Sequence, residues 1–152
     1  MCVPFLLGDN MDDKYMKIAY NEALKAYKKG DVPIGCIIVK DDKIISKAYN
    51  KKEKNNNAVE HAEIIAINKA CKKLKTWHLE DCKLYTTMEP CMMCSGAILQ
   101  SRINYICYSI KNDNFGAIKY LKKYNKKIQI VSNILKVESK ELVQKFFKEK
   151  RI

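Results

Sequence analysis

The chain has few of the residues that divide a protein into separate modules. Its 152 residues include five glycines and three prolines, and no stretch rich in proline, glycine or serine interrupts it. We also find no internal repeat and no low-complexity segment. These absences exclude a repeat architecture and a pair of tethered modules. We predict one domain over residues 12–152, with residues 1–11 as a dispensable N-terminal extension.

Long hydrophobic runs are also missing. No apolar stretch approaches the roughly 20 residues that a transmembrane helix needs. The N-terminal sequence MCVPFLLGDNM lacks the basic residues and the length of a signal peptide. The seven cysteines are odd in number and irregularly spaced, which does not fit the disulfide frame of a secreted protein. We therefore predict a cytoplasmic protein with reduced thiols and no membrane partner.

Acidic residues are scarce relative to basic ones. The chain has 17 acidic and 29 basic residues, which gives a formal net charge of +12, and all but two of the basic residues are lysine. Such an excess favours an anionic partner, with nucleic acid the usual candidate. AT-rich coding would produce the same abundance of lysine, so charge alone supports a nucleic-acid partner only modestly.

Hydrophobic periodicity predicts alternating helices and strands. The expected helices cover residues 12–29, 62–74, 91–102 and 140–151, and the expected strands cover residues 33–40, 43–49, 82–88, 104–110 and 127–132. The first two strands form a hairpin through Asp41-Asp42, a further short helix precedes the last strand, and Ser139 caps the last helix. This order predicts an α/β fold, with a mixed five-stranded sheet covered by helices on both faces.

The clearest chemical signal is the pair Cys91 and Cys94, which directly follows Pro90. Residues three apart in the first turn of a helix lie on one face, so both thiols can reach one ion. His61 opens the expected helix 62–74, and two facing helix starts would bring its imidazole to the thiols. Three protein ligands leave the fourth tetrahedral position open for water, which is typical of catalytic rather than structural zinc.

Glu63 lies two residues after His61 and reaches the same centre without being needed as a ligand. A zinc-bound water must lose a proton to become a nucleophile, and a leaving amine must gain one. A carboxylate beside the metal can perform both transfers in turn. We therefore predict Glu63 as the proton carrier of a hydrolytic site.

The cysteine pair alone permits two other interpretations. A redox dithiol would leave His61 and Glu63 without a role. A four-cysteine structural zinc site would need a second C-x-x-C pair, which the sequence lacks. The other cysteines are expected to pack as small hydrophobic residues, and His78, next to Trp77, is expected to be a surface or packing residue.

The motifs HAE (61–63) and EPCMMC (89–94) together resemble the H-x-E and P-C-x-x-C signature of zinc nucleoside and nucleobase deaminases. Further segments resemble, more narrowly, the TadA-type tRNA-specific adenosine deaminases. These segments are DVPIGCIIV (31–39), AYN (48–50), WHLEDCKLYTTMEPCMMCSGAILQSRI (77–103) and FFKEKR (146–151). The resemblance extends over nearly the whole chain from residue 12.

The resemblance implies a three-layer αβα cytidine-deaminase-like fold, a homodimer and one Zn²⁺ per subunit, held by His61, Cys91 and Cys94. It implies conversion of the wobble adenosine of a tRNA anticodon to inosine. The expected nucleophile is zinc-bound hydroxide attacking C6, with Glu63 as proton shuttle and ammonia as the leaving group.

The resemblance also assigns substrate contacts. The residues are Asn50, Ala62, Pro90, Phe146, Phe147, Lys148 and Arg151. Asn50 would hydrogen-bond the flipped base, because a carboxamide both donates and accepts. The last helix would contact the anticodon stem-loop, although neighbouring phenylalanines point in different directions and at least one is expected in the core. The lysine-rich segments 51–57 and 119–127 are either phosphate contacts or solvated faces.

Two other functions remain open at this point. Guanine and cytidine deaminases share the signature but act on free bases or nucleosides, and they need neither a basic surface nor a terminal aromatic-basic helix. A non-catalytic, zinc-stabilised RNA-binding subunit would not need Glu63, which is present. The segment Asn57–Glu60 and the short stretch after Ser109 differ from many relatives, and both regions are expected to shape base preference and subunit contacts.

Overall fold

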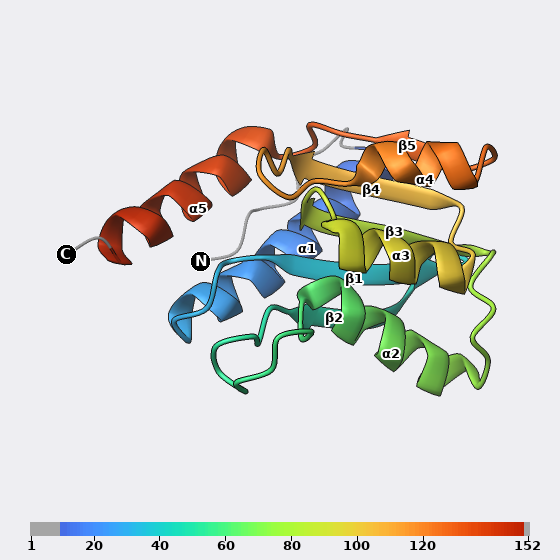
Figure 1. Cartoon of the computed structure of the whole chain (residues 1–152), viewed down its shortest axis with the longest axis horizontal. Coiled ribbons are helices and arrows are strands. Elements are labelled where there is room, and N and C mark those ends of the chain that lie inside the picture. The colour runs from blue at the N-terminus through green and yellow to red at the C-terminus, as the bar shows by residue number, and fades with distance from the viewer. Residues whose placement is uncertain (1–9, 151–152) are drawn as a thin grey trace.

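The computed structural model describes residues 10–150 of the chain (Figure 1). The elements in chain order are α1 (Met11–Lys28), β1 (Gly35–Lys40), β2 (Lys43–Tyr49), α2 (Ala62–Leu74), β3 (Cys82–Met88), α3 (Met92–Ser101), β4 (Tyr105–Ile110), α4 (Ile118–Tyr124), β5 (Gln129–Val131) and α5 (Lys136–Lys150). The strands form one sheet in the order β2-β1-β3-β4-β5. β1 is antiparallel to both of its neighbours, whereas β3, β4 and β5 are parallel. The predicted mixed five-stranded sheet is confirmed.

Helices cover both faces of this sheet (Figure 1). Consecutive strand residues point to opposite faces, so Ile37 packs with Met16 of α1, whereas Ile38 packs in the cluster that contains Ile98 of α3. α2 and α4 lie on the α3 face, and α5 runs beside the end of α1. Both faces of the central strands are therefore covered, and β1 and β4 are buried along nearly their whole length. The predicted three-layer αβα architecture is confirmed.

The two central parallel strands determine where a site can form. Because β3 and β4 run in the same direction, their carboxyl ends meet at one edge of the sheet. α3 begins just beyond the end of β3, and the segment after β4 leaves from the same edge. Figure 1 shows the start of α2 beside the start of α3 there. Three segments that are distant in sequence thus converge at this edge.

Two local predictions have different outcomes. Asp41 and Asp42 join β1 to β2 with φ of 51° and 59°, as in a type I′ hairpin turn. The predicted start of the last helix is wrong, because α5 begins at Lys136 and not after Ser139. The backbone N–H of Ser139 donates to the carbonyl of Leu135 at 3.1 Å, so Ser139 already belongs to the helical turn. Its buried hydroxyl has no hydrogen-bond partner within the described residues.

The first residues of α1 are tied to the sheet. Asn10 caps the helix, since its side-chain oxygen accepts from the N–H of Asp13 at 2.9 Å. The carboxylate of Asp12 accepts from the hydroxyls of Tyr85 and Tyr105 at 2.8 and 2.7 Å. The predicted dispensable extension lies outside the described residues except for Asn10 and Met11, so its dispensability stays a prediction. Among residues 10–150, no helix combines the length and apolar composition needed to cross a bilayer.

Gly35 provides a test of how closely α1 packs on β1. A Cβ at Gly35 would lie 2.0 Å from the carbonyl oxygen of Ala19 and 2.5 Å from the nitrogen of Ala23, both backbone atoms. Gly35→Ala is therefore expected to lower the free energy of unfolding by about 3 kcal/mol or more, as an overpacked core does. Chemical denaturation measures the change.

The matched control is Gly96→Ala on α3, where an added Cβ meets nothing within 4 Å. This variant is expected to gain about 0.5–1 kcal/mol, because alanine is the better helix former. Equal stability of the two variants would contradict the close packing of α1 on β1.

Candidate active site

Two helix starts present the candidate ligands. His61 is the N-cap residue of α2 and Cys91 is the N-cap residue of α3. Both have extended backbones, and neither side chain forms a capping hydrogen bond with its own helix. Cys94 follows in the first turn of α3. The imidazole and the thiols therefore remain available to one another or to a bound ion.

The distances fit a tetrahedral metal site. His61 Nδ1 lies 3.7 Å from Cys91 Sγ and 3.6 Å from Cys94 Sγ. The three ligand atoms all lie within 4.8 Å of one another, and within the described part of the chain no other side chain joins the group. Zinc–sulfur and zinc–nitrogen bonds of about 2.3 and 2.0–2.1 Å in a tetrahedron separate nitrogen from sulfur by about 3.6 Å. The residues thus fit zinc with one open position.

Without a metal, the pKa values of the two thiols at the site shift in opposite directions. Hydrogen bonds from Cys94 and His61 lower the pKa of Cys91 to about 3 despite its partial burial. The neighbouring Cys91 thiolate and burial raise the pKa of Cys94. The hydrogen bond with Cys91 also raises the pKa of His61. One thiolate is therefore favoured in the metal-free site, and a bound cation would favour loss of the second thiol proton.

Glu63 places a protonatable carboxyl beside these ligands. It lies in the first turn of α2 and is 4% exposed. Burial raises its pKa to about 7, partly opposed by a backbone hydrogen bond and by the charge of His61. Its charge in turn raises the pKa of Cys94, which indicates that the carboxyl and the thiol are close. A carboxyl with a pKa near neutrality can both accept and donate a proton at pH 7.

Two adjoining clefts open beside His61. The larger has a volume of about 680 Å³, and Asn50, His61 and Ala62 are among the residues that line it. The smaller has a volume of about 580 Å³ and extends past Cys91 along the start of α3. His61 borders both clefts, so a molecule in either would lie next to the candidate metal site.

Asn50 is held in place where it lines the larger cleft. It is 5% exposed, its Nδ2 donates to the carbonyl of Val32 at 3.3 Å, and its Oδ1 accepts from the N–H of Lys52 at 3.2 Å. A carboxamide has two donor hydrogens and two acceptor lone pairs, so one of each remains. The side chain is thus held by the backbone while it still presents a donor and an acceptor.

One face of α5 forms a wall of the larger cleft. The residues that line it are Lys136, Lys140, Val143, Gln144 and Phe147. Only Phe147 was predicted from the sequence. Lys140, Val143 and Gln144 follow Lys136 by four, seven and eight residues. This spacing indicates a common helical face and is the sequence signal that could have identified them. The wall is therefore mixed, with two ammonium groups and one phenyl ring that is 42% exposed.

The structure does not bring the other predicted contacts into either cleft. Phe146 is 7% exposed and packs edge-on against Tyr27, with ring centroids 6.4 Å apart, as expected for the phenylalanine of the pair that lies in the core, and its contact with substrate stays a prediction. Pro90 is buried and its carbonyl accepts from the N–H of Ala117 at 2.9 Å. Lys148 is exposed but lines neither cleft. Arg151 lies outside the described residues.

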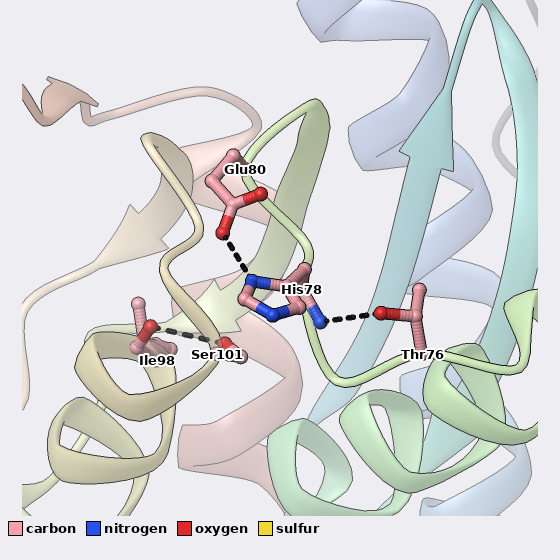
Figure 2. Close-up of polar contacts among 5 residues, drawn as sticks. All are labelled: Thr76, His78, Glu80, Ile98 and Ser101. Atoms are coloured by element: carbon pink, nitrogen blue, oxygen red, sulfur yellow. Dashed lines mark hydrogen bonds and ion pairs between the residues drawn. The ribbon is translucent and has the colours of Figure 1, made fainter.

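The second histidine lies away from this site, in the connection between α2 and β3. Figure 2 shows His78 Nδ1 3.0 Å from Glu80 Oε1, and the backbone N–H of His78 donating to Thr76 Oγ1 at 3.1 Å. Its ring stacks on Trp77 with centroids 3.7 Å apart. His78 is therefore a packing residue of the surface, as predicted. Beside it, Ser101 Oγ donates to the carbonyl of Ile98 and closes the last turn of α3 (Figure 2).

Comparisons with known proteins match this chain to deaminases. The model of the MafB19-like deaminase family matches residues 10–151. The tRNA-specific adenosine deaminase of Rickettsia bellii is 41% identical over 144 residues, which span 90% of this chain and 99% of that protein.

Two solved structures share the fold. One, from a study of A-to-I editing by tRNA:A34 deaminases at the wobble position of transfer RNA, has a TM-score of 0.79 at 31% identity and covers 85% of this chain and 98% of its own. A guanine deaminase from Bacillus subtilis has a TM-score of 0.65 at 36% identity and covers 75% of this chain and 76% of its own. The fold alone therefore does not separate polynucleotide from free-base substrates.

The burial of Glu63 predicts a pH-dependent stability difference. In the metal-free protein its pKa is about 7, compared with an ordinary value of 4.5. Below pH 4.5 the carboxyl is protonated whether the protein is folded or unfolded, and above pH 7 the folded state carries the full cost of a buried charge. Glu63→Gln is expected to raise the free energy of unfolding at pH 8 by about 2–3 kcal/mol and to leave it unchanged at pH 4.

The comparison uses chemical denaturation of the metal-free proteins at both pH values. Glu53→Gln, at an exposed position, is the control and is expected to change stability at neither pH. A gain from Glu63→Gln that is equal at pH 4 and pH 8 would contradict a buried, titrating carboxyl.

Proposed function

Because this chain belongs to the MafB19-like deaminases and to the family of tRNA-specific adenosine deaminases, we propose that it converts the wobble adenosine of a tRNA anticodon to inosine. The observation that supports this most is the position of the His61, Cys91 and Cys94 cluster at a cleft with basic walls. The charged side chains that line the larger cleft are Lys52, Lys111, Asp113, Lys136 and Lys140. Four cations and one anion suit a phosphate backbone better than a neutral base.

We propose one zinc ion per chain, held by His61 Nδ1 and the sulfurs of Cys91 and Cys94. Thiolates together with imidazole favour zinc over the harder magnesium and calcium ions. When bound, zinc supplies Lewis acidity that brings the pKa of water toward neutrality. The positive ends of α2 and α3 both point at the site and favour the thiolate ligands.

Glu63 carries the protons of the reaction. Replacement of the 6-amino group of adenine by oxygen requires one proton to leave the attacking water and ammonia to depart with an added proton. The carboxyl of Glu63 accepts the first proton and delivers it to the nitrogen that leaves. Burial suits this role, since it excludes bulk water that would otherwise exchange the proton.

Asn50 and Ala62 receive the flipped base. The remaining donor and acceptor of Asn50 match a purine edge, which offers both kinds of group. Ala62 lines the same cleft beside His61, and its small side chain leaves room for the base. An anticodon loop is already partly unstacked, and presenting one of its bases costs less than opening a duplex.

The surroundings fit a large anionic substrate. Phe147 on α5 offers an exposed ring for stacking on a neighbouring base, and Lys119 borders the smaller cleft. We propose that the enzyme acts in the cytoplasm as a homodimer on the anticodon stem-loop. Met92, which is 70% exposed at the start of α3, is an apolar side chain that a second subunit would cover.

The deciding experiment is a deamination assay with purified protein of measured zinc content. We expect inosine in an anticodon stem-loop with adenosine at the wobble position, and no turnover of free adenosine, cytidine or guanine. Activity is expected to be lost on zinc removal and in Glu63→Ala, although Glu63→Ala keeps its zinc.

The other outcomes reassign the function. Turnover of guanine alone would favour the activity named for the structurally similar B. subtilis protein. Zinc and RNA binding without any turnover would favour a non-catalytic RNA-binding subunit.

The neighbouring phenylalanines provide a matched pair of variants. Phe147→Ala is expected to raise the KM for the stem-loop about 5- to 150-fold, as the loss of one base stack does, with little change in stability. Phe146→Ala is expected to destabilise the protein by about 3 kcal/mol, because its ring is buried against Tyr27. Steady-state kinetics and thermal denaturation separate the two. An unchanged KM for Phe147→Ala would remove this ring from the RNA contact.

A further inference from the structure

The segment between β4 and α4 forms a wall shared by both clefts. We call residues 111–117 the rim loop. Asn112, Asn114 and Phe115 border the larger and the smaller cleft alike. Phe115 is 72% exposed, so burial of its side chain does not hold the loop in place. Some other interaction has to fix this wall against the candidate metal site.

That interaction is made by the buried carboxylate of Glu89. Glu89 is 9% exposed and directly precedes the Pro90-Cys91 step. Its Oε1 accepts from the backbone N–H of Asn112 at 3.2 Å, and its Oε2 accepts from the backbone N–H of Ile118 at 3.2 Å. Asn112 lies near the start of the rim loop, and Ile118 is the first residue of α4, directly after the loop. A single side chain therefore holds both ends, with charge-assisted hydrogen bonds.

The packing around the carboxylate is close. A Cβ on Gly116 would lie 2.5 Å from both the carboxyl carbon and Oε2 of Glu89. The N–H of Ala117 donates to the carbonyl of Pro90 at 2.9 Å, and Gly116 forms an isolated bridge with Cys91. The rim loop thus lies directly against the segment that carries the ligand Cys91.

A chain of hydrogen bonds connects Glu89 to the tip of the rim loop. Asn112 donates its backbone N–H to Glu89, and its own Oδ1 accepts from the backbone N–H of Phe115 at 3.1 Å. The position of Phe115 over the clefts therefore depends on Asn112, and that of Asn112 depends on Glu89.

We propose that Glu89 is a positioning residue for substrate binding: its carboxylate fixes the rim loop relative to Cys91 and thereby sets where Asn112 and Phe115 meet the substrate. The part of this inference that concerns substrate rests on the proposed function. The part that concerns the loop stands on the hydrogen bonds alone. The motif EPCMMC then has two roles, with its cysteines facing the metal and its glutamate holding the cleft wall.

The test is Glu89→Gln, which keeps the shape of the side chain but replaces one acceptor oxygen by an NH₂ group. One of the two backbone N–H groups is then left facing a donor. We expect amide hydrogen exchange at Asn112 and Ile118 to accelerate about 10- to 100-fold, as the loss of a hydrogen bond to a charged acceptor does. We expect the KM for the stem-loop to rise about tenfold, kcat to change less than about threefold, and zinc content to stay at the wild-type value.

A second buried carboxylate supplies the matched control. Asp31 is 1% exposed, and its two oxygens accept from the N–H groups of Glu53 and Lys54 at 2.8 and 3.0 Å. Asp31→Asn is the same isosteric change and is expected to accelerate exchange at residues 53 and 54 but not at residues 112 and 118. Gly116→Ala crowds the same carboxylate with its added Cβ. Its effects on exchange should resemble those of Glu89→Gln, and the double variant should show less than the sum.

Three results would overturn the proposal. Unchanged exchange at residues 112 and 118 in Glu89→Gln would show that the carboxylate does not hold the loop. Loss of zinc would move the role of Glu89 to the metal site, and a fall in kcat at constant KM would move it to the chemical step. If the wild-type protein does not deaminate the stem-loop, the proposed function fails, while the exchange experiment still decides whether Glu89 holds the rim loop.

Discussion

The approach of His61 Nδ1 to two sulfurs, at 3.6 and 3.7 Å, is the constraint on which the rest of this structure depends. It requires the starts of α2 and α3 to meet at one edge of the sheet, and the parallel pairing of β3 with β4 provides that edge. It also requires both helices to be fixed in place by packing against the sheet. The apolar faces of α2 and α3 pack into one core cluster with the strands, so the ligands project from rigid elements.

Much of this arrangement could be predicted from the sequence. Helices and strands of strong periodicity give the order of elements, and with only two histidines the choice of a nitrogen ligand is narrow. The structure separates the two histidines clearly, because His78 stacks on Trp77 and pairs with Glu80. His61, by contrast, has no capping bond and faces two thiols. A metal site can be predicted from local sequence when the spacing of its ligands along the chain already fixes their relative positions.

The walls of the cleft could not be predicted in the same way. The ends of a helix depend on tertiary contacts as well as on capping residues, and the buried Ser139 was mistaken for a cap although α5 begins at Lys136. The lysines and the glutamine on α5 look like an ordinary solvated face until the helix is placed beside the cleft. Glu89 reads as a flanking residue of the cysteine motif, because its partners are backbone groups more than 20 residues away.

The shallow anchoring of α5 has a kinetic consequence. Only Ser139, Leu142 and Phe146 of its 15 residues are buried, and the Ser139 hydroxyl lacks a partner within the described residues. Such a helix is expected to separate from the body at a much lower free energy than the core strands unfold. A bulky product that fills the cleft can then leave by transient outward displacement of α5, while the sheet and the metal ligands stay in place.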